Sequence, residues 1–212
     1  MDTEQTWRVI EQQRLAIADL LDGLSTEQWE SPSLCAGWRI RDVAAHLTAV
    51  SQPPSPGSLL VDLIRARGSF HRLNTLASRR RARRPTEQLV ADLRAGAASR
   101  KVPLVSNDRN VLFDLLVHGQ DIAIPLGVDL RMPPEAAADG ASRVWSMGWP
   151  FWAQRRLRGM RLTATDVEWS VGSEAEIRGP IRGLLLLLTG RTSTAAPLLS
   201  GEGLAQLARS AT

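Results

Sequence analysis

Hydrophobic residues in the first 130 positions recur every three or four residues, which is the spacing of amphipathic helices. The first such stretch follows Thr3, which we interpret as its N-cap, and extends to Leu24. Residues 25–28 (STEQ) have the form of a capping box and predict a short helical turn around Trp29. After a loop, a further helix is expected to begin near residue 40. Its expected buried face consists of Ile40, Val43, Ala44, Leu47 and Val50.

Three more helices are predicted in this half. Residues 53–57 (PPSPG) break the chain, and a long third helix is expected after them. Its apolar residues are Leu59, Leu60, Leu63, Ile64, Phe70, Leu73 and Leu76. Thr86 is expected to cap the next helix, and the last helix lies between Asn107 and Pro125. Several amphipathic helices joined by short breaks predict an up-and-down bundle.

The pattern changes after Gly127. Pro133 and Pro134 predict a helix that continues to about Met147. Short alternating segments at 160–165, 167–171 and 175–178, separated by turn residues, predict a small antiparallel meander. Helices over residues 180–189 and 203–208 are expected to follow. We therefore predict a mainly α protein, with a helical bundle over residues 1–130 and a small α+β domain over residues 131–212.

Composition indicates an ordinary globular protein, with 43% hydrophobic and 23% charged residues. The single cysteine, Cys35, excludes an internal disulfide and fits a reducing compartment. The polar N-terminus does not resemble a secretory signal. The longest apolar run, residues 184–188, is too short to cross a bilayer. These features predict a cytoplasmic protein that does not associate with a membrane.

Positive charge is supplied almost entirely by arginine, since Lys101 is the only lysine and the net charge is +4. The one local concentration is the run 79–84 (RRRARR), which could bind phosphates. We interpret it as a solvated helix end stopped by Pro85, because arginine near a helix C-terminus is favoured by the helix dipole. With no tyrosine and three phenylalanines, the chain has no row of aromatics on which bases could stack. A nucleic-acid partner is therefore not expected.

Three histidines are the candidates for site chemistry. Asp114 and His118 are four residues apart on one predicted helix, so both side chains can reach a single point. Asp121 lies close to the same stripe and could orient His118 or cap the helix end. Taken alone, His46 reads as core filling, the pair on the later helix as a local hydrogen bond, and His71 as structural.

The combination of the three residues is more informative than each residue alone. Metal sites in helical bundles are built from inward side chains on facing helices. Two imidazoles from His46 and His118 with the carboxylate of Asp114 suit Zn²⁺ or a similar divalent ion and leave one position open. A metal site and an ordinary structural role for these residues both remain possible on spacing alone.

Three stretches resemble one protein family. Residues 33–47 (SLCAGWRIRDVAAHL) and 116–127 (LVHGQDIAIPLG) are similar to two signatures of the mycothiol-dependent maleylpyruvate isomerase family, which belongs to the DinB-like metal-binding four-helix bundles. Residues 164–172 (ATDVEWSVG), 179–180 and 187–191 (LLTGR) resemble its C-terminal domain more loosely. The resemblance implies a DinB-like bundle followed by a small α+β domain.

The resemblance also implies a chemistry. It implies that a divalent metal, with zinc as the first choice, is bound by His46, Asp114 and His118. The thiol partner would be mycothiol, which actinobacteria use in place of glutathione. The metal would hold the mycothiol sulfur as a thiolate that attacks a small electrophilic substrate. The arginine-rich, lysine-poor composition is compatible with such a high-GC organism.

Two positions depart from the family pattern. Asp114 stands where the family usually has glutamate, and this shorter side chain must bring its helix nearer to a metal. Arg39 stands where the family tends to have a hydroxyl residue at a helix N-cap, a change expected to affect stability only. By position, Arg191 is the candidate for binding an anionic substrate, with a structural arginine as the alternative. Cys35 is interpreted as a buried structural cysteine, with a redox-sensitive thiol as the alternative.

Three functions fit these features. The first is a mycothiol-dependent metalloenzyme, either an isomerase or a thiol S-transferase. The second is a metal-dependent hydrolase of the same superfamily, because an open zinc position serves water as well as a thiol. The third is a metal-binding regulatory module without catalysis. This alternative remains because Asp114 stands where the family usually has glutamate.

Overall fold

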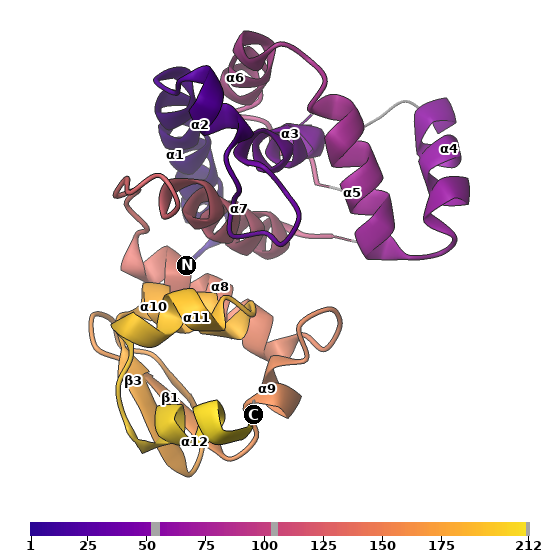
Figure 1. Cartoon of the computed structure of the whole chain (residues 1–212). Coiled ribbons are helices and arrows are strands. Elements are labelled where there is room, and N and C mark those ends of the chain that lie inside the picture. The colour runs from indigo at the N-terminus through magenta and orange to yellow at the C-terminus, as the bar shows by residue number, and fades with distance from the viewer. Residues whose placement is uncertain (52–55, 103–105, 211–212) are drawn as a thin grey trace. The chain divides into compact units, whose positions relative to one another are not determined.

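The computed structural model describes residues 1–51, 56–102 and 106–210, and within these ranges most of the chain is helical (Figure 1). The strands in this part of the chain form one three-stranded sheet. The mainly α fold is therefore confirmed. Positions 53–55 of the predicted break, and the side chains of Leu59, Leu60 and Phe70, lie outside what the structure describes.

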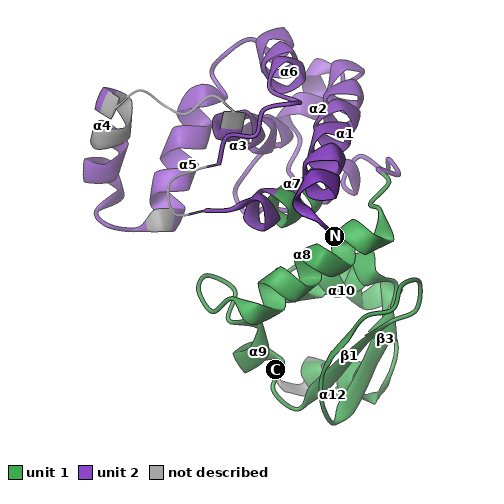
Figure 2. Cartoon of the chain, turned by 180° about the vertical axis from the view of Figure 1, so that it is seen from behind, with its two compact units in different colours: residues 1, 112–117, 131–212 green, residues 2–111, 118–130 purple. Residues whose placement is uncertain are grey.

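Two compact units make up the chain (Figure 2). Unit 2 comprises Asp2–Val111 and His118–Leu130, and unit 1 comprises Met1, Leu112–Val117 and Arg131–Thr212. One unit boundary thus falls after residue 130, while residues 112–117 in the middle of one helix group with unit 1. The division into domains 1–130 and 131–212 stays a prediction.

Helices α1 to α7 fill the first half of the sequence. They are α1 (Thr3–Asp22), α2 (Thr26–Glu30), α3 (Ile40–Ser51), α4 (Pro56–Ala66), α5 (Phe70–Arg81), α6 (Thr86–Ala95) and α7 (Asp108–Ala123). Helix α1 packs against α6, and α3 packs against α5 and α6. Arg14, a buried residue of α1, donates from Nη1 to the carbonyl oxygens of Gly96 and Ala97 just after α6, at 3.1 and 3.0 Å.

Helix starts agree with the sequence at some positions and differ at others. The capping box at Ser25 and Gln28 is confirmed. Thr3 is not an N-cap but the first helical residue, because Asp2 caps α1 and accepts a hydrogen bond from the amide of residue 5. Thr86 likewise begins α6 without capping it, and Pro85 occupies the cap position.

The predicted long third helix is two helices, α4 and α5. Arg67 and Gly68 between them both have positive φ, 49° and 77°, which no continuous right-handed helix allows. Ser69 then caps α5 by accepting from the amide of Arg72 at 3.4 Å. The expectation was wrong because apolar residues keep their helical spacing on both sides of this break.

The second half contains α8 (Pro134–Ser146), α9 (Ala153–Arg156), β1 (Met160–Ala164), β2 (Ser170–Gly172), β3 (Ala175–Gly179), α10 (Ile181–Leu188), α11 (Thr192–Ala195), the 3₁₀ helix η1 (Ala196–Leu198) and α12 (Glu202–Ser210). The helix predicted from Pro133 and the one predicted over residues 180–189 are confirmed as α8 and α10. No helix in the described part of the chain is both long and apolar enough to cross a membrane.

The sheet is not the antiparallel meander that we predicted. Its strand order is β2-β1-β3, with β2 antiparallel and β3 parallel to β1. After β2 the chain passes the end of β1, where the amide of Ala175 donates to the carbonyl oxygen of Gly159 at 3.1 Å. Gly172 has φ of 81°, and a Cβ there would lie 2.1 Å from the carbonyl oxygen of Met160. A glycine is therefore required where the chain leaves β2.

Candidate metal centre

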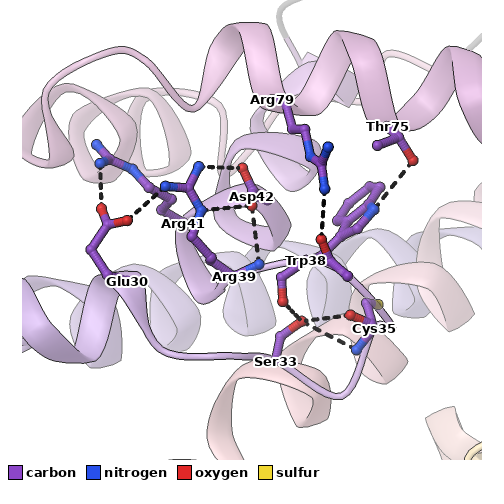
Figure 3. A network of polar contacts seen from close by, with 10 residues as sticks. Glu30, Ser33, Cys35, Trp38, Arg39, Arg41, Asp42, Thr75 and Arg79 are labelled. Carbon is purple, nitrogen blue, oxygen red and sulfur yellow. Dashed lines mark hydrogen bonds and ion pairs between the residues drawn. The ribbon is translucent and has the colours of Figure 1, made fainter.

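Helix α3, which carries His46, begins in an ionic network (Figure 3). Asp42 accepts a hydrogen bond from the backbone amide of Arg39 at 3.0 Å, and the guanidinium of Arg39 donates to both oxygens of the same carboxylate. Glu30 of α2 accepts from Arg39 Nη1 at 2.6 Å and also pairs with Arg41. Arg39 thus fixes the helix start through Asp42, although it cannot cap as a hydroxyl residue would.

The charge on Asp42 is stabilised by these contacts. The side chain is buried, which on its own would raise the pKa of the carboxyl group. The hydrogen bonds from the Arg39 side chain and backbone outweigh burial, so the pKa of Asp42 lies below its ordinary value. The start of α3 therefore holds an ionised carboxylate at neutral pH.

The loop before α3 positions Cys35 and Trp38. Ser33 accepts from the amide of Cys35 at 3.1 Å and donates to the carbonyl oxygen of Trp38 at 2.9 Å. The indole Nε1 of Trp38 donates to Thr75 Oγ1 of α5 at 3.3 Å, and Arg79 of α5 donates to the carbonyl oxygen of Gly37 at 2.9 Å (Figure 3). These hydrogen bonds together orient the Trp38 ring.

Helix α7 carries the other two candidate ligands. It is continuous from Asp108 to Ala123, so Asp114 and His118 are held one turn apart on the same helix. Gly119 follows, and a Cβ there would lie 2.9 Å from Leu130 Cδ2 and 3.2 Å from Ile17 Cδ1. A Cβ next to His118 would thus crowd the side chains of Leu130 and of Ile17 in α1, a close approach that an interior helical glycine suggests.

The structure brings together all three residues of the predicted metal site. One ligand atom from each of His46, Asp114 and His118 lies within 4.8 Å of the others, and all three side chains are half-buried. The two imidazole rings meet edge to face, with centroids 4.9 Å apart and an interplanar angle of 76°. Two ring nitrogens and a carboxylate oxygen therefore converge on one point.

A second group shares His118. Its Nδ1 donates to Asp121 Oδ2 at 2.8 Å, and the thiol of Cys35 donates to the same oxygen at 3.0 Å. Cys35 Sγ also lies 3.5 Å from His118 Nδ1. Because Asp121 occupies Nδ1, Nε2 is the ring nitrogen that remains for a metal. A fully buried carboxylate that fixes the tautomer of a ligating histidine is the usual support of such a ligand.

Trp38 contacts both histidines. Its ring lies parallel to the His118 ring, with an interplanar angle of 7° and centroids 6.5 Å apart. It meets the His46 ring at 69° with centroids 5.6 Å apart. The indole therefore fixes the two imidazole planes relative to one another.

The donor set fits a divalent transition ion. Nitrogen and carboxylate ligands suit zinc, and three protein ligands leave a fourth position for a water or a substrate atom. The carboxylate of Asp121 supplies the outer hydrogen bond that ligating histidines normally make. A second possible metal-binding group consists of Cys35, His118 and Asp121. The sulfur, nitrogen and oxygen atoms of this group already hydrogen-bond to one another.

Other candidate residues have different surroundings. Arg191 lies in unit 1, directly before α11, and donates from Nη1 to the carbonyl oxygen of Thr189 at 2.8 Å. Its role in substrate binding stays a prediction. His71 is exposed on α5 and does not join the cluster. Cys35 is half-buried and hydrogen-bonded to the site, which differs from the buried structural cysteine that we expected.

The basic run 79–84 is not a purely solvated helix end. Arg80 pairs with Asp62 of α4, and Arg84 pairs with Asp92 of α6 at 2.7 Å. Arg81 donates to Thr48 of α3 at 3.4 Å. These arginines tie the end of α5 to three neighbouring helices, a role that a local charge pattern does not reveal.

Sequence reasoning did not identify Trp38 as part of the site, nor the contacts of Cys35. Both residues lie far before His118 in the sequence, and neither spacing nor composition indicates such a contact. The one available signal was their place in the stretch 33–47, directly before the helix that carries His46.

Comparisons with known proteins concern the first half of the sequence and the fold. Residues 10–109 match the family model for the mycothiol maleylpyruvate isomerase N-terminal domain. Two crystal structures, one of the mycothiol-dependent maleylpyruvate isomerase and one of a histidine-to-alanine mutant of that enzyme, each share the fold with a TM-score of 0.65 and 12% sequence identity. Each match covers 95% of this chain and 93% of the other chain. A comparison with curated proteins found no match. Over residues 10–109, just under half of its length, the chain is therefore similar to the mycothiol maleylpyruvate isomerase N-terminal domain.

Proposed function

We propose that this protein is a cytosolic, divalent-metal-dependent enzyme that uses mycothiol, as an isomerase or a thiol S-transferase, on a small electrophilic substrate. The observation that carries the proposal is the convergence of His46, Asp114 and His118 within 4.8 Å. The family of residues 10–109 and the fold shared with a mycothiol-dependent isomerase support the choice of thiol.

Each residue of the site has a distinct task in this proposal. His46 from α3 and His118 and Asp114 from α7 hold the metal, zinc first, at three positions. Asp121 keeps the proton of His118 on Nδ1, so that Nε2 presents its lone pair. Trp38 covers the imidazole rings and limits the access of water to them.

A bound divalent ion would lower the pKa of a coordinated mycothiol thiol, so that the thiolate is available near neutral pH. The chain's own contribution is to hold three ligands and to leave the fourth position open. Arg191 is proposed to bind the anionic part of the substrate, since a guanidinium pairs with a carboxylate through two parallel hydrogen bonds.

Calorimetric titration with mycothiol tests the proposal. We expect zinc-loaded protein to bind mycothiol at least tenfold more tightly than metal-free protein does, and His46→Ala to remove this gain. S-methylmycothiol, which cannot form a thiolate, serves as the matched control ligand and should show no gain from zinc.

Equal affinity for both ligands, or affinity that survives removal of the metal, would refute coordination of the thiol. Stoichiometric metal without any mycothiol binding would instead favour a hydrolase, in which water takes the open position.

A further inference from the structure

A second recess lies between α4 and α5. It is an open pocket of about 340 Å³, which we call the arginine pocket. It is lined by Arg65, His71, Arg72, Thr75, Leu76 and Arg79. All but Arg65 come from α5, where positions 72, 75, 76 and 79 share one helix face.

The pocket is strongly cationic. Three guanidinium groups and one imidazole line it, and none of its lining residues is acidic. Arg65, in the last turn of α4, and Arg72, in the first turn of α5, form no ion pair with any residue that the structure describes. Arg80 and Arg84, at and just after the other end of α5, are both paired with aspartates. The charges of Arg65 and Arg72 are therefore not neutralised by an ion pair within the described chain, whereas Arg79 lies close enough to Asp42 to lower the pKa of that carboxyl group.

The position of Arg72 argues against a role in helix stability. It lies in the first turn of α5, where the helix dipole disfavours a positive charge. The dipole and the arginines instead add their positive potentials at the same place, and both favour an anion there. A charge placed against the local dipole is expected at a binding site.

The lining indicates an organic anion more than an inorganic one. Guanidinium groups recognise carboxylates through two parallel hydrogen bonds. Leu76 supplies an apolar surface for a carbon skeleton, and a volume of about 340 Å³ lies at the lower end of the range for small-molecule sites. Several guanidinium groups in one recess suit more than one carboxylate.

The pocket is physically connected to the metal centre. The hydroxyl of Thr75, which lines the pocket, accepts from Trp38 Nε1 at 3.3 Å, and the Trp38 ring contacts His46 and His118. Arg79, also in the lining, donates to the carbonyl oxygen of Gly37 next to Trp38. Trp38 thus contacts the pocket residue Thr75 on one side and the two histidines on the other, and Figure 3 shows the hydrogen bond between Trp38 and Thr75.

We propose that the arginine pocket binds the carboxylate groups of a small organic polyanion. This binding needs no metal and does not depend on the proposed function.

Titration of metal-free protein with succinate, at low ionic strength, tests the assignment. We expect saturable binding of one succinate per chain and at least tenfold weaker binding by the double variant Arg65→Gln/Arg72→Gln. Both residues are exposed, so the variant should keep the circular dichroism spectrum and melting temperature of the wild type. The matched control is Arg83→Gln/Arg158→Gln, which loses the same charge at exposed positions outside the pocket and should bind succinate within twofold of the wild type.

Three results would overturn the proposal: no saturable succinate binding, an unchanged affinity in the pocket variant, or an equal loss in the control variant. Tighter binding of inorganic phosphate than of succinate would overturn the assignment to carboxylates. Because the protein is metal-free, failure of the metal site leaves this test unaffected, and the two proposals can fail separately.

Discussion

At the scale of single residues, Asp121 is the support on which the proposed ligand His118 depends. It is fully buried, and it accepts hydrogen bonds from His118 Nδ1 and from the Cys35 thiol. We expect Asp121→Asn to weaken zinc affinity about 10–100-fold, because the amide no longer fixes the histidine tautomer as a carboxylate does. Competition with a chromogenic chelator measures this affinity. Cys35→Ser, which keeps a donor to Asp121, is the control and should change affinity less than threefold.

Variants at Asp114 test whether aspartate can serve as a metal ligand where the family usually has glutamate. The convergence of its carboxylate with both imidazoles in this structure indicates that aspartate reaches the site. We therefore expect Asp114→Glu to keep zinc affinity within about tenfold of the wild type. Asp114→Ala should weaken zinc affinity more than the replacement of a supporting residue such as Asp121 does. The same chelator competition measures both variants. An alanine variant that binds zinc like the wild type would remove Asp114 from the ligand set.

The pKa of Asp42 gives a prediction of pH dependence. It lies below its ordinary value because hydrogen bonds from Arg39 outweigh the effect of burial. A carboxyl group of this kind adds stability above its unfolded pKa of ~3.9, and that stability is lost as pH falls through the folded value. We expect Asp42→Asn to lower the free energy of unfolding by about 1–3 kcal/mol at pH 7 and by less near pH 3. Urea unfolding at both pH values measures this, and an equal loss at both would contradict it.

The sequence suggested His46, Asp114 and His118 as candidate ligands only together with the family resemblance, and it did not suggest their surroundings; their role as ligands stays a prediction. Asp114 and His118 were predictable as a pair because helical spacing alone places them on one face. Asp121 was also predictable as a partner of His118 for this reason. Trp38 and Cys35 were not, because their contacts depend on how the loop before α3 folds onto α7, and no local pattern encodes that.

At the scale of elements, α7 lies close to the side chains of Ile17 in α1 and of Leu130 at Gly119, the residue next to His118. Gly119 permits this packing, since a Cβ would come within 2.9 Å of Leu130 and 3.2 Å of Ile17. We expect Gly119→Ala to destabilise the protein by about 1–3 kcal/mol through overpacking, despite the better helix propensity of alanine. Thermal or urea unfolding measures the loss. Gly57→Ala in α4, where a Cβ would meet nothing within 4 Å, is the matched control and should be neutral or slightly stabilising.

Element types were more predictable from sequence than their pairing. Helices α7, α8 and α10 were predicted near their observed bounds because their apolar periodicity ends at clear caps and prolines. The predicted sheet order was wrong, because alternation of apolar and polar residues identifies a strand but not the strand with which it pairs. The sequence did not reveal the break between α4 and α5, because two residues with positive φ, Arg67 and Gly68, end the helix without changing the spacing of the apolar residues around them.

At the scale of the whole molecule, metal binding should appear as stability. A ligand that binds only the folded state adds about 2.7 kcal/mol at a hundredfold excess over its dissociation constant. For a chain of this size we expect a rise in melting temperature of about 5–10 °C with zinc. Differential scanning calorimetry of metal-free and zinc-loaded protein measures the shift. His118→Ala should abolish it, and a shift that persists in this variant would place the metal elsewhere.

The central claim is that His46, Asp114 and His118 together bind one divalent ion. Its most direct test is the zinc content of metal-free protein after equilibration with zinc and gel filtration, measured by elemental mass spectrometry. The account predicts one zinc per chain in the wild type and in His71→Ala, the matched histidine control, and close to none in His46→Ala and His118→Ala. A wild-type protein that takes up no metal, or a His46→Ala variant that still holds one zinc per chain, would contradict it.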